Sequence, residues 1–187
     1  CYKYGRGVEQ DYAEAVKWYR QAADAGSAAA MCNLGVCYEN GEGVEQDLRE
    51  AARLYRQAAE GDDAAAQCNL GHLYEPGEGA EKDCKQAAHC YQRAADQGYP
   101  RAMCNLGVCC EFGRGVPMDI RKAATLYRRA AEAGDRVAAC NLGYLYETGT
   151  GVSQSWTDAV KWYSQSAEEE YPRAQYNLAL CYEHGSG

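Results

Sequence analysis

The sequence predicts an all-α fold, a solenoid of helical hairpins that each span 36 residues. Three observations predict it: a tripeptide recurs at one constant spacing, other residue types recur in step with it, and the apolar residues have helical spacing. Asn-Leu-Gly begins at Asn33, Asn69, Asn105 and Asn141, and Asn177 begins the variant Asn-Leu-Ala. A fixed period of about 20 to 50 residues is typical of solenoid proteins.

The repeat divides the chain into units. We expect a partial unit at residues 1–26, four full units, and a partial unit at residues 171–187. The full units are residues 27–62, 63–98, 99–134 and 135–170. Because both ends of the sequence fall within a unit, we expect the chain to be a piece of a longer repeat protein.

The first helix of each unit carries the Asn-Leu-Gly tripeptide. In the first full unit, Ala30, Leu34 and Cys37 lie at positions i, i+4 and i+7, which is one face of a helix. Gly35 lies on the same face, where the missing side chain lets a neighbouring helix approach closely. Gly41 follows the helix and can supply the left-handed backbone that ends it.

The second helix of each unit follows a residue that can cap it. These residues are Asp11, Asp47, Asp83, Asp119 and Ser155. Their side chains can accept hydrogen bonds from the free amides of the first helical turn. Glu50 lies three residues after Asp47, so we expect a reciprocal capping box there. The buried face of this helix is predicted from three columns: an alanine column, a mixed column of Tyr12, Leu48, Cys84, Ile120 and Trp156, and a tyrosine column of Tyr19, Tyr55, Tyr91, Tyr127 and Tyr163.

The amino-acid composition argues against two classes of protein, nucleic-acid binders and membrane-spanning proteins. The chain has 27 acidic and 19 basic residues and a net charge of -8, which argues against nucleic acid as a partner. No apolar run approaches the roughly 20 residues of a membrane span, so we expect no membrane-spanning segment. Leu, Val, Ile and Phe are scarce, and the repeat explains this because closely packed Ala, Gly and Tyr columns can replace a large aliphatic core.

The cysteines have the pattern of core residues. Their number, 11, is odd, so at least one lacks a partner within the chain. Cys37, Cys109 and Cys181 share a column with Leu73 and Leu145, as expected for small buried hydrophobic residues. We therefore expect free thiols in the core and a reducing, cytoplasmic location.

The combined pattern of both helices resembles the Sel-one-like repeat (SLR) family, whose members are related to tetratricopeptide repeats. It reads Ala-x-x-Asn-Leu-Gly-x-x-Tyr-x-x-Gly-x-Gly-Val and then Asp-x-x-x-Ala-x-x-x-Tyr-x-x-Ala-Ala, and it covers the whole chain. The resemblance implies a right-handed α/α superhelical solenoid. It also implies a non-enzymatic adaptor that holds a protein or peptide partner in a concave groove.

One cysteine-rich branch of that family has been linked to penicillin binding and weak hydrolysis. The resemblance places its disulfides between the column Cys32, Cys68, Cys104, Cys140 and the column Ala23, Ala59, Ala95, Ala131, Ala167. Because the second column holds only alanine, the resemblance implies that these disulfides are absent. A weak β-lactam hydrolase stays an alternative function, and a purely structural spacer is another.

Candidate binding residues lie on the first helices. The asparagine column can bond a ligand backbone, because its carboxamide is both donor and acceptor, or it can bond backbone between repeats. The column consists of Asn33, Asn69, Asn105, Asn141 and Asn177. An acidic column shares this side and either favours basic ligands or is only a solvated edge; it includes Glu39, Glu75, Glu111 and Glu147. His72 and Tyr144 lie between the two columns.

The sequence offers little for metal or cofactor chemistry. Cys68 and His72 lie at i and i+4, but no obvious further ligand accompanies them. The Gly-x-Gly loops follow helices and lack the strand and the Lys-Ser/Thr of phosphate-binding loops, so we expect structural turns. We expect no metal and no cofactor. Uncapped terminal repeats expose core, so end-to-end association with a second copy is a further expectation.

Overall fold

The computed structural model describes residues 10–186, and within this range its regular elements are ten α-helices. Residues 1–9 and 187, which belong to the predicted partial units, lie outside the described residues. The helices are α1 (Tyr12–Asp24), α2 (Ala28–Asn40), α3 (Leu48–Glu60), α4 (Ala64–Tyr74), α5 (Cys84–Asp96), α6 (Pro100–Phe112), α7 (Ile120–Glu132), α8 (Arg136–Thr148), α9 (Trp156–Glu168) and α10 (Pro172–Glu183). The even-numbered helices are the predicted first helices and the odd-numbered ones the second helices.

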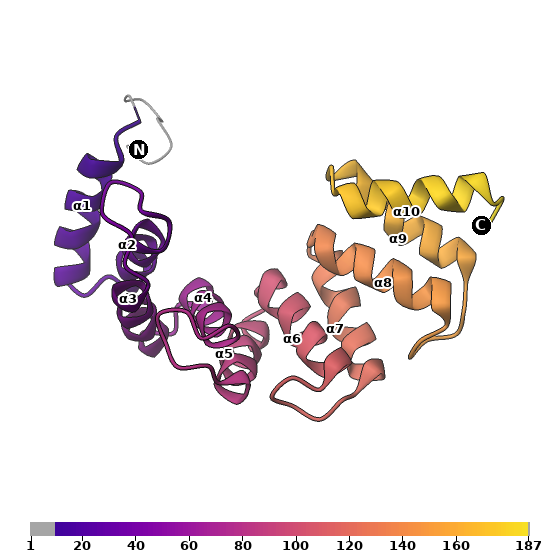
Figure 1. Cartoon of the computed structure of the whole chain (residues 1–187), viewed down its shortest axis with the longest axis horizontal. Coiled ribbons are helices and arrows are strands. Elements are labelled where there is room, and N and C mark those ends of the chain that lie inside the picture. Colours follow the sequence, from indigo (N-terminus) through magenta and orange to yellow (C-terminus); the bar gives the residue numbers. More distant parts are fainter. Residues whose placement is uncertain (1–9, 187) are drawn as a thin grey trace. The chain divides into compact units, whose positions relative to one another are not determined.

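The chain forms two compact units, residues 1–94 and 95–187. In the first unit α1 packs against α2, α2 against α3 and α3 against α4. In the second unit each helix from α6 to α9 packs against the next one along the chain. Figure 1 shows the helices within each unit as antiparallel hairpins. The predicted all-α solenoid of 36-residue hairpins is confirmed. None of the described helices is both long and apolar enough to cross a membrane.

All five predicted capping residues cap the second helices. The Asp119 carboxylate accepts from the Lys122 amide at 2.9 Å, for example, and the Ser155 hydroxyl accepts from the Asp158 amide at 3.2 Å. The capping box expected at Glu50 is wrong. The Asp47 N–H donates instead to the Tyr38 carbonyl at 2.9 Å, which closes the preceding loop. The Glu50 carboxylate is then left to pair with Arg53.

Glycine lets the tyrosine column reach the first helices. A Cβ built on Gly35 would lie 2.6 Å from a ring carbon of Tyr55, and one on Gly107 would lie 2.6 Å from Tyr127. Both tyrosines are fully buried. The close helix approach predicted from the glycine column is therefore confirmed, and it fixes how each second helix sits on the first helix before it.

The cysteines lie in the core, as predicted. Cys37, Cys109 and Cys181 are at most 4% exposed, and among the ten described cysteines, all free thiols, only Cys84 is half-buried. Burial raises the pKa of the Cys90 and Cys140 thiols. A raised pKa keeps a thiol protonated and so weakly nucleophilic, which suits a packing role.

Candidate functional site

The first helices of the second unit surround a cavity of about 440 Å³. Its lining comes from α6, α7, α8 and α10: Val108, Glu111, Phe112, Tyr127, Asn141, Tyr144 and Arg173. Three of the predicted binding residues, Glu111, Asn141 and Tyr144, thus lie together. The volume is within the range of about 300 to 1,000 Å³ that is usual for ligand pockets.

Asn141 differs from the other asparagines in its hydrogen bonding. The Asn33 amide donates to the Ala29 carbonyl of its own helix at 2.8 Å, and the amides of Asn69 and Asn177 lie 4.0 Å from the sulfur atoms of Cys32 and Cys140. The half-buried Asn141 carboxamide has no hydrogen-bond partner among residues 10–186. It faces the cavity with both its donor and its acceptor available.

The glutamates of the acidic column make structural contacts that the repeat pattern did not predict. Each glutamate accepts a hydrogen bond from the buried tyrosine of the next second helix. These pairs, with their oxygen–oxygen distances, are Tyr55–Glu39 at 2.5 Å, Tyr91–Glu75 at 3.0 Å, Tyr127–Glu111 at 2.6 Å and Tyr163–Glu147 at 2.5 Å. The constant 16-residue separation of the Glu and Tyr columns was the signal that could have revealed them. The column is therefore not simply a solvated edge.

Burial and the glutamate contacts raise the pKa of two of the tyrosine hydroxyls. Burial, and then the hydrogen bond and charge of Glu111, raise the pKa of Tyr127 well above its usual range. Burial and Glu147 do the same for Tyr163. Both hydroxyls therefore stay protonated donors at neutral pH. Glu111 uses Oε2 for Tyr127, so this carboxylate is positioned rigidly at the cavity edge.

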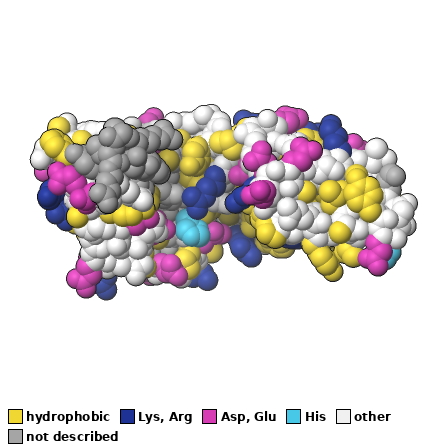
Figure 2. Space-filling model, turned by 90° about the horizontal axis from the view of Figure 1, so that it is seen from above, with side chains coloured by type: hydrophobic (Ala, Val, Ile, Leu, Met, Phe, Trp, Pro, Cys, Tyr) yellow, Lys and Arg dark blue, Asp and Glu magenta, His cyan; other side chains and the backbone are white. Residues whose placement is uncertain are grey.

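Exposed aromatic rings border the cavity. Phe112 is 59% exposed and Tyr144 is 43% exposed, although both are large apolar side chains. Figure 2 shows hydrophobic side chains gathered over the part of the molecule where α8 to α10 lie in Figure 1. Exposed apolar patches of this kind commonly mark interaction sites.

Sequence reasoning did not find Phe112 and Arg173. Phe112 is the single phenylalanine of the chain, so it belongs to no column of repeated residues. Arg173 is exposed at the cavity, and its repeat position varies, with Ala29, Ala65, Arg101 and Val137 in the other units. Both residues stand at variable positions of the repeat, which a search for shared columns overlooks.

The other predicted binding residues lie outside this cavity. Asn177 and Glu147 belong to the same unit but do not line it, and Asn105 is half-buried on α6. The remaining residues lie in the first unit: Asn33, Asn69, His72, Glu39 and Glu75.

The structure does not bring together a metal site in the residues that it describes. Cys68 is fully buried in α4, whereas His72 is exposed one turn later. Across residues 10–186 no group of three or more His, Cys, Asp or Glu side chains is arranged to hold a metal ion.

The comparisons with known proteins agree on one family. The model of the Sel1 repeat matches six times, at residues 1–27, 28–63, 64–99, 100–135, 136–171 and 172–187. No curated protein matches the sequence.

Solved structures give the same result. A Sel1 repeat protein from Oxalobacter formigenes is 37% identical with a TM-score of 0.90, over 97% of this chain and 74% of that one. The protective antigen c5321 of uropathogenic Escherichia coli, described as having an SLR fold, is 38% identical with a TM-score of 0.85, over 98% of this chain. The match spans 39% of that antigen's length.

A more distant similarity is to cysteine-rich protein B of Helicobacter pylori. It is 25% identical with a TM-score of 0.56, over 71% of this chain and 96% of that one. Six matched repeats along the whole sequence, together with two close structural relatives, lead to one conclusion: the chain belongs to the Sel1 repeat family.

Proposed function

We propose that the chain is a protein-interaction scaffold that binds an extended peptide in the cavity between α6, α8 and α10. Sel1 repeat proteins are in general protein-interaction scaffolds and mainly not enzymes, which supports the class of function. The finer proposal, a peptide in this cavity, is carried by the Asn141 carboxamide, which is half-buried and has no partner among the described residues.

The chemistry of the cavity suits an extended peptide. A carboxamide can donate to a peptide carbonyl and accept from a peptide N–H at once, so it holds a backbone whatever the side chains are. Val108, Phe112 and Tyr144 offer an apolar surface beside it for one ligand side chain. Arg173 adds an exposed guanidinium and Glu111 a carboxylate, so the cavity offers one charge of each sign to the side chains of a ligand.

Peptide titrations test the proposal. An array of eight-residue peptides is screened with the wild type, and retained peptides are titrated by fluorescence anisotropy. We expect Asn141→Ala to weaken binding about tenfold, because the loss of hydrogen bonds to a half-buried amide costs about 1 to 1.5 kcal/mol.

Asn33→Ala is the matched control. Its amide is already bonded to the Ala29 carbonyl and it lies in the other unit, so its affinity should stay within about twofold of wild type. Equal affinity of Asn141→Ala and the wild type would remove Asn141 from the site.

A further inference from the structure

We propose a second binding site, in the first unit, where the gap between α1 and α3 receives the arginine side chain of a partner peptide. This site uses other helices than the cavity at Asn141 and does not depend on it. One repeat position is filled by the chain's own side chains in two gaps between successive second helices and is left open in this one.

The gap between α3 and α5 is filled by an arginine of the chain itself. The Arg93 guanidinium donates to the Ala59 carbonyl at 3.0 Å and to the Asp62 carboxylate at 2.8 Å. Gln67, which is fully buried, donates to the same carbonyl at 3.4 Å. The carbonyl near the end of a second helix is thus the acceptor for an incoming side chain.

The gap between α7 and α9 repeats this arrangement with a different donor. Gln165, at the repeat position of Arg93, donates through Nε2 to the Ala131 carbonyl at 2.8 Å. Ala131 stands at the position of Ala59, so donor and acceptor keep their places two repeats apart. The contact is therefore a property of the repeat position and not of one residue.

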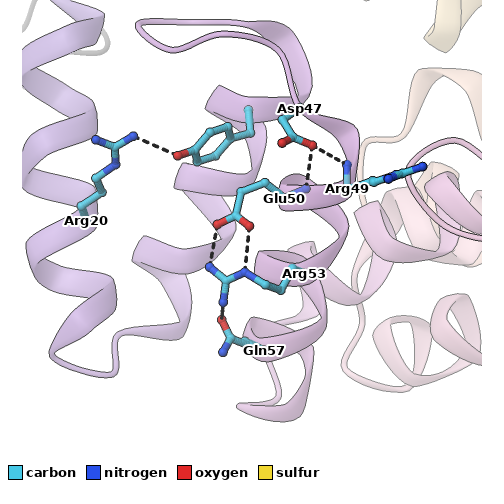
Figure 3. Close-up of polar contacts among 7 residues, drawn as sticks. Arg20, Asp47, Arg49, Glu50, Arg53 and Gln57 are labelled. Carbon is cyan, nitrogen blue, oxygen red and sulfur yellow. Dashed lines mark hydrogen bonds and ion pairs between the residues drawn. The ribbon is translucent and has the colours of Figure 1, made fainter.

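The gap between α1 and α3 lacks this contact. Gln57 stands at the position of Arg93, but its Oε1 accepts from Arg53 at 2.8 Å. Arg53 is itself held by both carboxylate oxygens of Glu50, at 2.8 and 2.6 Å (Figure 3). Met31 replaces Gln67, so among residues 10–186 no side chain donates to the Ala23 carbonyl.

The open gap has the size and the surface for an arginine side chain. It holds a cavity of about 340 Å³, whose floor includes Met31 and the buried Leu34 and Leu54. Such a floor suits the aliphatic stem of arginine, while the charged head group stays at the rim. At the rim the Ala23 carbonyl stands at the repeat position of Ala59, and the exposed Asp24 carboxylate, at the repeat position of Glu60, is a second acceptor.

Arg20, the other cation at this rim, is already engaged. Its guanidinium donates to the Tyr38 hydroxyl at 2.9 Å and lies 5.9 Å from the centre of the Tyr38 ring, so Figure 3 shows it turned toward α2. Arg53 is neutralised by Glu50. Arg20 keeps its positive charge beside the neutral hydroxyl. Arg56, at the same repeat position, makes the equivalent bond to the Tyr74 hydroxyl in the gap that holds Arg93, so an arginine in this position and a second one in the gap are compatible. Asp24 has no ion-pair partner among residues 10–186 and can pair with a ligand guanidinium.

A nuclear magnetic resonance titration of the full 187-residue chain tests this site. The probe is the peptide acetyl-Ala-Arg-Ala-amide, and the lysine and norleucine peptides are its controls. We expect the arginine peptide to shift the backbone amide signals of Ala23, Asp24 and Gln57, and to bind at least fivefold more tightly than the lysine peptide. Equal shifts with the norleucine peptide would overturn the proposal.

Variants in which a side chain of the protein itself fills the gap provide a second test of the site. Gln57→Arg supplies within the chain the side chain that Arg93 supplies in the next gap, so the peptide should no longer bind. Asp24→Asn should weaken binding about fivefold, whereas Glu60→Gln, the same repeat position on α3, should leave it unchanged. Unchanged binding by Gln57→Arg would contradict the proposal.

Circular dichroism shows whether Gln57→Arg is folded. Should it be unfolded, Met31→Gln replaces it, since this variant introduces the Gln67 contact to the Ala23 carbonyl. Loss of binding in Met31→Gln would then support the site, and retained binding would overturn it.

Discussion

At the scale of single residues, the repeat is held by a glycine, a tyrosine and a glutamate that act together. The glycine of a first helix leaves room for the tyrosine ring of the next second helix, and the tyrosine hydroxyl donates to a glutamate four residues after the glycine. Gly107, Tyr127 and Glu111 are one such set. Glycine is required here because of close approach and not because of its backbone angles.

A methyl group at this glycine should therefore be costly. In Gly107→Ala the new Cβ would lie 2.6 Å from the Tyr127 ring, so the helices must separate. We expect the free energy of unfolding in urea to fall by about 1 to 3 kcal/mol. In a Tyr127→Leu background the same change should cost clearly less, since the ring is gone. An equal cost in both backgrounds would show that the ring is not the cause.

At the scale of helices, each second helix begins at a side-chain cap. The repeat supplies the cap, and the backbone N–H of the capping residue is used separately, to close the loop onto the preceding first helix. Asp119, for example, caps α7 through its carboxylate while its N–H donates to the Cys110 carbonyl at 2.8 Å. One residue thus joins two helices of a hairpin.

Removing the cap should destabilise the second unit. We expect Asp119→Ala to lower the free energy of unfolding by about 1 kcal/mol, because the Lys122 amide loses its acceptor. Asp119→Asn keeps an acceptor oxygen and should stay within about 0.5 kcal/mol of the wild type. Chemical denaturation followed by circular dichroism measures both; similar losses in the two variants would point to charge and not to capping.

At the scale of the whole molecule, the hydroxyls of the tyrosine column connect stability to pH. The pKa of Tyr127 and of Tyr163 is raised by burial and by a neighbouring glutamate, whereas in the unfolded chain a tyrosine has a pKa of about 10. A pKa that is raised on folding gives stability that is fully present below the unfolded value. That stability decreases as the pH rises above about 10.

An alkaline titration should show this coupling. We expect tyrosinate absorbance at 295 nm to increase in two phases, with the later phase coinciding with the loss of helical circular dichroism. Tyr127→Phe should reduce the amplitude of that later phase. A later phase of unchanged amplitude in Tyr127→Phe, or one complete while the helices are intact, would contradict the burial of these hydroxyls.

More of the fold than of the candidate binding site could be predicted from the sequence. The 36-residue period, the caps and the glycine–tyrosine spacing follow from residue columns, because every repeat packs against its neighbours through the same contacts. The cavity depends instead on residues at variable repeat positions, such as Phe112 and Arg173, and on which asparagine is left without a partner. Those are consequences of side-chain contacts between helices, which a repeat pattern alone does not specify.

In the proposed complex, the cavity between α6, α8 and α10 holds a peptide backbone through Asn141. A crystal structure of the chain with a peptide selected from the array would show the contact itself. We expect an extended peptide in this cavity, with its N–H and carbonyl both bonded to the Asn141 carboxamide at about 2.9 Å. A peptide bound elsewhere, or bound here with the Asn141 carboxamide still unbonded, would contradict it.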